Sequence, residues 1–314
     1  MNTRATIRLL SDGRRLHLND GPIDLIIEAD GAGEEVRRAY QAATNRFVTI
    51  LDELCDELPL LRTRATASSP RPIGCIARRM SDVVSVYREQ CFITPMAAVA
   101  GAVAEAVLTA MTEAAQLDRA YVNNGGDIAL HLSPGYHYAI GMIERPEDPS
   151  LFGKFEISSI LPVRGVATSG WRGRSFSLGI ADAVTVLAES VAAADAAATI
   201  VANSVNLPDH PAITRVSARK ISPDSDLLNL PVTRTVGPLC NSEIFQALLA
   251  GAAAAQELQA KGWIHSAALC LQGEVFLAEP LRDRTGLKSR QILYSGITKE
   301  ANDRLVPSQR NTHA

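Results

Sequence analysis

The chain has 314 residues, 46% of them hydrophobic, and a formal net charge of -3. This apolar fraction excludes a disordered or collagen-like chain. The nearly neutral charge argues against a dedicated nucleic-acid-binding protein, which would need a basic surface. The composition therefore predicts a globular protein with a sizeable buried core.

The sequence indicates a reducing compartment. Its five cysteines are odd in number and form no CxxC pair, which argues against a disulfide framework and against a cysteine zinc site. The N-terminus shows no apolar signal region, and no apolar stretch has the length and flanks expected of a membrane span. We expect a cytoplasmic protein without a membrane partner.

In the N-terminal half, the spacing of apolar residues predicts helices alternating with hairpins. The predicted elements are a hairpin over residues 14–28 with its turn at 19–22, helices over 31–61, 76–87 and 96–115, and strands over 121–122, 128–132 and 136–143. The basic, Ser/Pro-rich run 62–72 is expected to be a mobile loop. Thr94 and Pro95 are typical of a helix start, with threonine as the N-cap. The helix after them has almost only small apolar side chains, which predicts that it is buried.

The C-terminal half shows the same mixture of elements. The predictions are two strands within 152–166, a loop over 168–178, a buried strand over 183–187, a small-residue helix over 191–205, a turn-rich peripheral stretch over 206–241, a helix over 243–260 capped by Asn241 or Ser242, and a hairpin over 266–271 and 274–278. The tail after Pro280 is expected to fray beyond Val306.

Strands that occur mostly in hairpins, with helices between them, favour an α+β fold. We expect a mixed or antiparallel sheet packed against small-residue helices. The chain forms a single domain over residues 1–314, or two intimately packed subdomains over about 1–205 and 206–314. The small-residue helices would also suit tight packing across a homodimer.

Three constellations of residues can support chemistry, and the first is a glycine turn. Asn124, Gly125, Gly126 and Asp127 lie between two predicted strands. Adjacent glycines allow backbone N–H groups to approach a ligand closely, and the flanking side chains are polar. The same string is also common in ordinary hairpins, so the local pattern leaves a ligand-binding turn and a plain turn open.

The second constellation is the loop 168–177. It combines glycines, hydroxyls and two arginines that could hold a phosphate or carboxylate, and the candidate binding residues are Thr168, Gly170, Arg172, Arg174, Ser175 and Ser177. Trp171 or Phe176 could stack on a planar ring. Ser169 is a candidate nucleophile, although no histidine is near it in the sequence. A solvated basic loop is the alternative.

The third constellation is Asp182 followed by Asp195 and Thr199. The last two are separated by four residues on a predicted helix, so both side chains project from one face. An aspartate among alanines is costly to bury unless it is paired or bound to a cation. A carboxylate and a hydroxyl together suit Mg²⁺, whereas a carboxylate bonded to backbone amides is the structural alternative.

Taken together and in this order, the motifs resemble an uncharacterised bacterial and archaeal family related to the ApbE flavin transferases. The matching segments are Ile93–Ala104, Asn123–Ile128, Thr168–Gly170, Ser177–Val186 and Ala194–Thr199. The resemblance implies an ApbE-like α+β fold. It assigns metal-ligand roles to Asp195 and Thr199, together with a backbone carbonyl near 95–97. The glycine turn and the start of the 168–177 loop correspond to loops around a flavin nucleotide.

The family activity implied is the Mg²⁺-assisted cleavage of the pyrophosphate of FAD and transfer of FMN to a protein threonine. The chain departs from ApbE enzymes at 174–179, where they have a histidine-rich strand and an Asp-Pro-x-x-Gly loop. This departure would suit a smaller anionic ligand.

We therefore expect an enzyme acting on an anionic, heterocyclic small molecule. Mg²⁺ and FAD or FMN are the expected cofactors, and Asp127 or Asp182 would be the general base or would orient other groups. One alternative is a ring-opening hydrolase for a cyclic amide or a related carboxylated heterocycle. In it, Ser169, Asp127 or water attacks, and the amides of Gly125 and Gly126 stabilise the oxyanion. Another alternative is a non-catalytic protein that binds a flavin or another anion.

Overall fold

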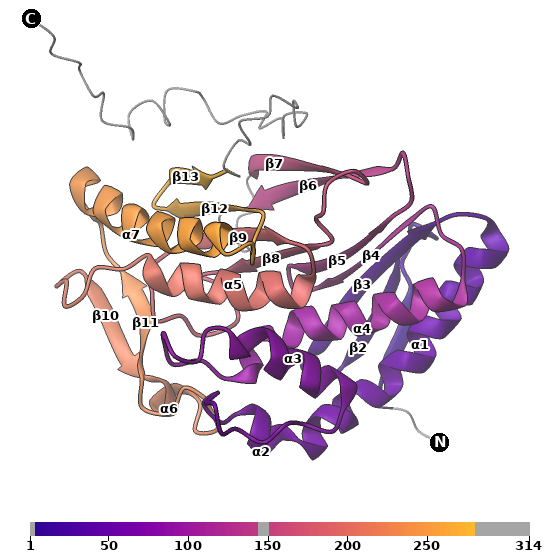
Figure 1. The fold of residues 1–314 in the computed structure, drawn as a ribbon, viewed down its shortest axis with the longest axis horizontal. Coiled ribbons are helices and arrows are strands. Elements are labelled where there is room, and N and C mark those ends of the chain that lie inside the picture. The colour runs from indigo at the N-terminus through magenta and orange to yellow at the C-terminus, as the bar shows by residue number, and fades with distance from the viewer. Residues whose placement is uncertain (1–3, 144–150, 280–314) are drawn as a thin grey trace, which may run out of the picture.

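The computed structural model describes residues 4–143 and 151–279 (Figure 1). Its strands are β1 (Thr6–Leu9), β2 (Leu16–Asp20), β3 (Ile23–Asp30), β4 (Arg119–Asn124), β5 (Asp127–Leu132), β6 (His137–Ile143), β7 (Leu151–Ser158), β8 (Gly165–Ser169), β9 (Ala183–Ala188), β10 (Ile213–Ser217), β11 (Pro231–Val236), β12 (Ser266–Leu271) and β13 (Glu274–Ala278). Its helices are α1 (Gly33–Asp56), α2 (Leu58–Leu61), α3 (Cys75–Ser85), the 3₁₀ helix η1 (Pro95–Ala98), α4 (Val99–Ala114), α5 (Val191–Ser204), α6 (Ala218–Ile221) and α7 (Asn241–Ala260).

A nine-stranded antiparallel sheet organises the described part of the chain. Its strand order is β1-β2-β3-β4-β5-β8-β9-β12-β13, and β6–β7 and β10–β11 form separate two-stranded sheets. Every strand pair in these sheets is antiparallel. This architecture confirms the predicted α+β class.

Helices α1, α4, α5 and α7 cover one face of the sheet, and the β6–β7 hairpin covers part of the other face (Figure 1). Strand β3 alternates between buried and half-buried side chains, as expected for a strand with one covered face. Strand β9 is buried along its whole length. Val186 of β9 belongs to the core on the helix side, and Leu187 belongs to the core beneath the hairpin.

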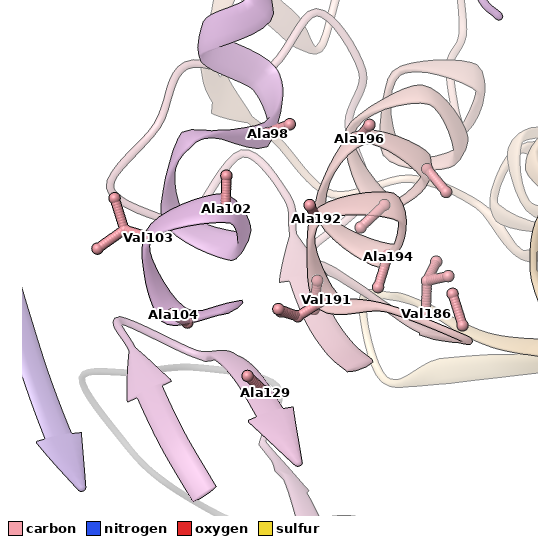
Figure 2. Close-up of a cluster of buried hydrophobic side chains, with 14 of the residues drawn as sticks. Ala98, Ala102, Val103, Ala104, Ala129, Val186, Val191, Ala192, Ala194 and Ala196 are labelled. Atoms are coloured by element: carbon pink, nitrogen blue, oxygen red, sulfur yellow. The ribbon is translucent and has the colours of Figure 1, made fainter. Parts of the chain in front are cut away.

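Small residues allow α5 to lie unusually close to its neighbours. A Cβ atom would lie 2.6 Å from the Val191 carbonyl oxygen if built at Gly101, 2.2 Å from the Ser190 carbonyl carbon if built at Gly165, and 2.0 Å from the Ala202 carbonyl oxygen if built at Gly179. Figure 2 shows the small side chains where α4 and α5 approach each other. The small residues of α4 and α5 thus pack against each other within one chain.

Several predicted boundaries were wrong. The predicted helix over 31–61 is two helices. The first ends at Asp56 and the second begins at Leu58, because the helix is interrupted at Glu57, two residues before Pro59. Strand β1 was not predicted. The second strand expected within 152–166 begins only at Gly165 and continues to Ser169, so the loop after it begins at Gly170. Helix α7 is capped by a capping box of Cys240 and Glu243 rather than by Asn241 or Ser242.

The segment 206–241 was predicted to be peripheral, but it packs against the rest of the fold. The Thr233 hydroxyl donates a hydrogen bond to the Gly179 carbonyl at 2.7 Å, in a buried position. The Thr94 hydroxyl donates to Asp226 Oδ2 at 2.5 Å. Thr94 occupies the predicted N-cap position, but its side chain makes no capping bond, and the α-helix itself starts after one 3₁₀ turn. The expected fraying after Pro280 lies outside the described residues.

Among the described residues, one helical stretch is long and apolar enough to cross a membrane by length and composition alone, although it contains Glu105 and Glu113. Pro95–Ala114 has a mean hydropathy of 1.4, and half of it is buried inside the described fold. A buried core helix meets the same criteria.

We predict that Gly101→Ala destabilises the protein by about 1–3 kcal/mol, because the added methyl group overlaps the backbone of α5. Urea unfolding at neutral pH measures this change. Gly33→Ala is the matched control, since nothing lies within 4 Å of a Cβ atom built there. Equal stability of the two variants would contradict the close contact.

Candidate functional site

The glycine turn joins β4 to β5 at the edge of the candidate site. Gly125 has φ +65° and Gly126 has φ +115°, a backbone region that side chains disfavour. The Gly126 N–H donates to Asn123 Oδ1 at 2.9 Å. This amide is therefore already paired and is not a free oxyanion donor.

The residues on either side of the two glycines connect the turn to other elements. The Asn124 side-chain amide donates to the Ala100 carbonyl at 3.1 Å, which places the turn beside the first turn of α4. Asp127 is only 8% exposed, and its Oδ1 accepts the Thr168 N–H at 3.2 Å. The turn, α4 and β8 thus meet at Asp127.

Asp195 reaches the same point from α5. Its Oδ2 accepts the Gly101 N–H at 2.9 Å, and it also interacts with the Ala100 N–H. Both amides lie in the first turn of α4, where N–H groups lack partners within the helix and the helix dipole favours negative charge. Gly101 makes this contact possible, because a side chain there would overlap α5.

The start of α5 is capped in a corresponding way by a carboxylate from α4. Glu105 Oε2 accepts the Ala192 N–H at 3.4 Å. Arg79 Nε donates to Glu105 at 2.8 Å, and Arg79 Nη2 donates to the N-cap residue Ser190 at 2.6 Å. Each of the two helices therefore provides an acid for the N-terminus of the other, and this fixes their relative position.

The two aspartates disfavour each other's charge. Burial raises the pKa of Asp127 from its ordinary value of 3.8 to about 7, against the lowering effect of the Thr168 amide. The pKa of Asp195 is raised well above 3.8, first by loss of contact with water and then by the negative charge of Asp127. Two carboxylates in this situation share a proton or bind a cation.

Thr199 lies one helical turn after Asp195 and is half-buried. Within the described ranges, no hydrogen bond engages its hydroxyl, so an oxygen one helical turn from the Asp195 position remains available. No group of three or more His, Cys, Asp or Glu side chains in the described parts of the chain could hold a metal. A cation here would need two carboxylates, a hydroxyl and other oxygen ligands.

Asp182 forms a second cluster, which is fully hydrogen-bonded. Its side chain is 1% exposed. It accepts bonds from Trp171 Nε1 at 3.0 Å, Arg172 Nε at 2.6 Å and the Gln272 N–H at 2.6 Å. These bonds hold the Trp171 and Arg172 side chains and the Gln272 amide around one carboxylate, while the predicted role of Asp182 as a general base or an orienting residue stays a prediction.

The other predicted residues of the loop differ in their positions. The Arg174 guanidinium lies beside the turn, since a Cβ atom at Gly125 would be 3.9 Å from its Nη1, and Arg174 and Ser175 are exposed. The Ser177 hydroxyl is buried and bonds with Asn203 and the Gly179 N–H, so it supports the end of α5. Ser169 is half-buried at the end of β8, and the described structure contains no hydrogen bond between it and a histidine.

The backbone amides of Ala100 and Gly101 could not be identified from the sequence pattern. The small-residue helix was predicted to start at 96, but its α-helical part starts at Val99, which moves the free N–H groups to these two residues. The structural alternative for Asp195, bonding to backbone amides, is therefore present. Burial and the charge of Asp127 raise the pKa of Asp195 against the lowering effect of these amides.

A cavity of about 140 Å³ lies elsewhere, between the 62–72 loop, α3 and Pro95. Its walls include Thr66, Arg71 and Ser85. Of the residues expected at the site, Pro95, from the 95–97 range expected to provide a carbonyl, also lines it.

Comparison with known proteins identifies the family. The family described as "AbpE bacteria" matches residues 7–277. The chain belongs to this family. The membership confirms the ApbE-like resemblance expected from the sequence motifs.

Two archaeal relatives are similar over part of their length. The chain is 38% identical over 148 residues to the UPF0280 protein of Methanococcus vannielii, covering 46% of this chain and 59% of the relative. It is 37% identical over 146 residues to the UPF0280 protein of Methanothrix thermoacetophila, covering 43% and 53%. The aligned region thus spans just over half the length of these relatives, and their names state no activity.

Among solved structures, the apo form of the Pseudomonas stutzeri flavinyl transferase ApbE is similar at 10% identity. The match covers 88% of this chain and 93% of that chain, with a TM-score of 0.42.

We predict that the carboxylate pair makes stability depend on pH. Because the pKa of folded Asp127 lies near 7 instead of 3.8, the folded state binds more protons between about pH 4 and pH 7, and stability falls as pH rises through this window. In EDTA, the free energy of unfolding of Asp127→Asn should therefore rise by about 2–4 kcal/mol relative to that of the parent when the pH is raised from 4.5 to 7.5.

Urea unfolding at the two pH values measures this gain. Asp224→Asn, which changes an exposed aspartate, is the control and should follow the parent. A parallel pH dependence of Asp127→Asn and the parent would show that Asp127 ionises normally.

Proposed function

We propose that the chain is a magnesium-dependent enzyme that cleaves the pyrophosphate of a flavin dinucleotide, transferring FMN to a hydroxyl acceptor or to water. The observation that supports this most is the convergence of Asp127 and Asp195 at the first turn of α4, with the pKa of both raised. Membership of an ApbE-like family supports the substrate class.

The residues at this point fit a magnesium ion. Mg²⁺ prefers oxygen ligands and is often held by one or two carboxylates, waters and substrate phosphates. Asp195 and Thr199 would hold it, with Asp127 close by, and a cation would offset the repulsion between the two carboxylates. When bound, the ion neutralises charge that develops on the phosphates.

Binding of the substrate phosphates would fall to the turn and the loop after β8. Arg174 lies beside Gly125, and no ion pair engages it in the described residues. An exposed arginine next to a turn without side chains can approach a phosphate and bond with two of its oxygens. Arg174 thus provides a positive charge where ApbE enzymes have histidines.

In the reaction, an acceptor oxygen attacks the phosphorus of the FMN half. The bond from this phosphorus to the bridging oxygen breaks, and AMP leaves with the bonding electron pair. The proton of the acceptor hydroxyl passes to the carboxylate of Asp127, a buried side chain that would give up its own proton when a cation binds beside it. With water as acceptor, the products are FMN and AMP.

We expect Asp195→Asn to lower the Mg²⁺-dependent turnover of FAD at least about 100-fold, because it removes the ligand charge while preserving the size of the side chain. Thr199→Val should lower it less, by about tenfold. Chromatographic measurement of AMP and FMN release, with and without EDTA, tests both variants. Asp224→Asn is the control and should keep full activity.

Unchanged turnover in Asp195→Asn would contradict the proposal. Cleavage of cyclic amides without a flavin nucleotide would favour the ring-opening hydrolase instead. Tight FAD binding with no product over hours would favour a non-catalytic binding protein.

A further inference from the structure

The Trp171 indole and the Arg172 guanidinium lie against each other in the loop after β8. The guanidinium carbon of Arg172 is 4.5 Å from the centroid of the Trp171 ring. Both side chains are half-buried, so part of their surface faces solvent. A guanidinium and an indole in this contact form a flat, polarisable surface of the kind on which heteroaromatic rings stack.

Asp182 fixes the orientation of this pair through both partners. One of its oxygens accepts from Trp171 Nε1 at 3.0 Å and from Arg172 Nε at 2.6 Å, and the other accepts from the Gln272 N–H at 2.6 Å. Since the Asp182 side chain is 1% exposed, these bonds are shielded from water. The pair is thereby held in place before any ligand binds, which lowers the entropy cost of binding.

The backbone holds the pair in the same position. The Trp171 N–H donates to the Ala181 carbonyl at 3.0 Å. A Cβ atom at Gly170 would lie 2.4 Å from the Asp182 carbonyl oxygen, so only glycine lets the loop run this close to the chain before β9. The sequence Thr-Ser-Gly-Trp-Arg therefore has a geometric requirement at its glycine.

The pair lies within reach of the carboxylates. The Thr168 N–H bonds to Asp127, and three residues span at most about 11 Å, so Trp171 is no farther than this from Thr168. At the other end of the loop, Arg174 lies beside Gly125. A ligand whose phosphates lie at the turn can therefore place a ring at Trp171.

We propose that Trp171 and Arg172 form a preformed platform that stacks on the planar ring of an anionic nucleotide, and that Asp182 is its positioning residue. The inference rests on the function proposed above and adds the residues that recognise the ring. FMN and ADP, each containing one of the two rings of FAD, distinguish which ring binds here.

The first experiment measures the affinity of the full chain for FAD, FMN and ADP by calorimetry in Mg²⁺. Trp171→Ala should lower the affinity for FAD about tenfold. It should lower the affinity for either FMN or ADP, whichever contains the stacked ring, by a similar factor. Trp171→Phe, which keeps an aromatic ring, should stay within about threefold of the parent. Trp263→Phe is the matched control, because Trp263 packs edge-on against Tyr87 at 5.3 Å.

The second experiment tests positioning by a double-mutant cycle. In the parent, Asp182→Asn should lower the affinity for FAD about fivefold. In the Trp171→Ala background it should lower this affinity by less than about twofold, because Asp182 acts through the Trp171 ring. In turnover, Asp182→Asn should raise KM and leave kcat nearly unchanged. A role in folding alone would give the same change in both backgrounds.

Parent-like affinity of Trp171→Ala for all three ligands would overturn this inference and leave the proposed function intact. Equal effects of Asp182→Asn in the two backgrounds would overturn the positioning role. Absence of FAD binding by the parent protein would overturn both proposals. If Asp182→Asn does not fold, the comparison of Trp171→Ala with Trp171→Phe still decides whether the ring is used.

Discussion

The contact between the Asp195 carboxylate and the first turn of α4 is the interaction on which the rest of the site depends. It requires glycine at position 101 and the exchange of acidic caps between two small-residue helices. Helix N-termini offer unpaired N–H groups, and a carboxylate from a neighbouring helix satisfies them while locking the packing angle. The alanines of α5 allow this approach, and its single acid is consequently held close to Asp127.

This arrangement creates a chemical problem that the fold alone does not solve. The amides of α4 stabilise negative charge on Asp195, yet burial and the neighbouring Asp127 oppose it, and the second pair of effects is larger. Asp182, by contrast, accepts from three donors, one of which is the Arg172 guanidinium. One buried aspartate is thus satisfied by the protein, whereas the other two need a proton or a cation. This difference is the reason why we propose an organising role for Asp182 and a binding or reacting role for Asp127 and Asp195.

The sequence predicted much of this and failed where contacts are long-range. The isolated Asp195 among alanines and the Asn-Gly-Gly-Asp turn singled out Asp195 and Asp127 separately, because a charge in an apolar helix and adjacent glycines are local signals. The sequence did not predict that these two carboxylates would interact. The amides of Ala100 and Gly101 could not be located, since one 3₁₀ turn shifted the start of α4. Ser177 was predicted to bind ligand because the sequence does not distinguish a hydroxyl that faces a ligand from one bonded within the fold. Its hydroxyl bonds with Asn203 at the end of α5. The packing of 206–241 depended on tertiary contacts such as that of Thr94 with Asp226.

The most direct test of the central claim is calorimetric titration of the EDTA-treated protein with Mn²⁺ as a magnesium substitute, in buffers of different ionisation enthalpy. We expect one binding event near pH 6.5 that releases about one proton, because the metal displaces a proton held by one of the carboxyl groups of Asp127 and Asp195, whose pKa values are raised. Asp195→Asn should abolish the event. Absence of Mn²⁺ binding, or binding that neither releases a proton nor changes in Asp195→Asn, would contradict the account.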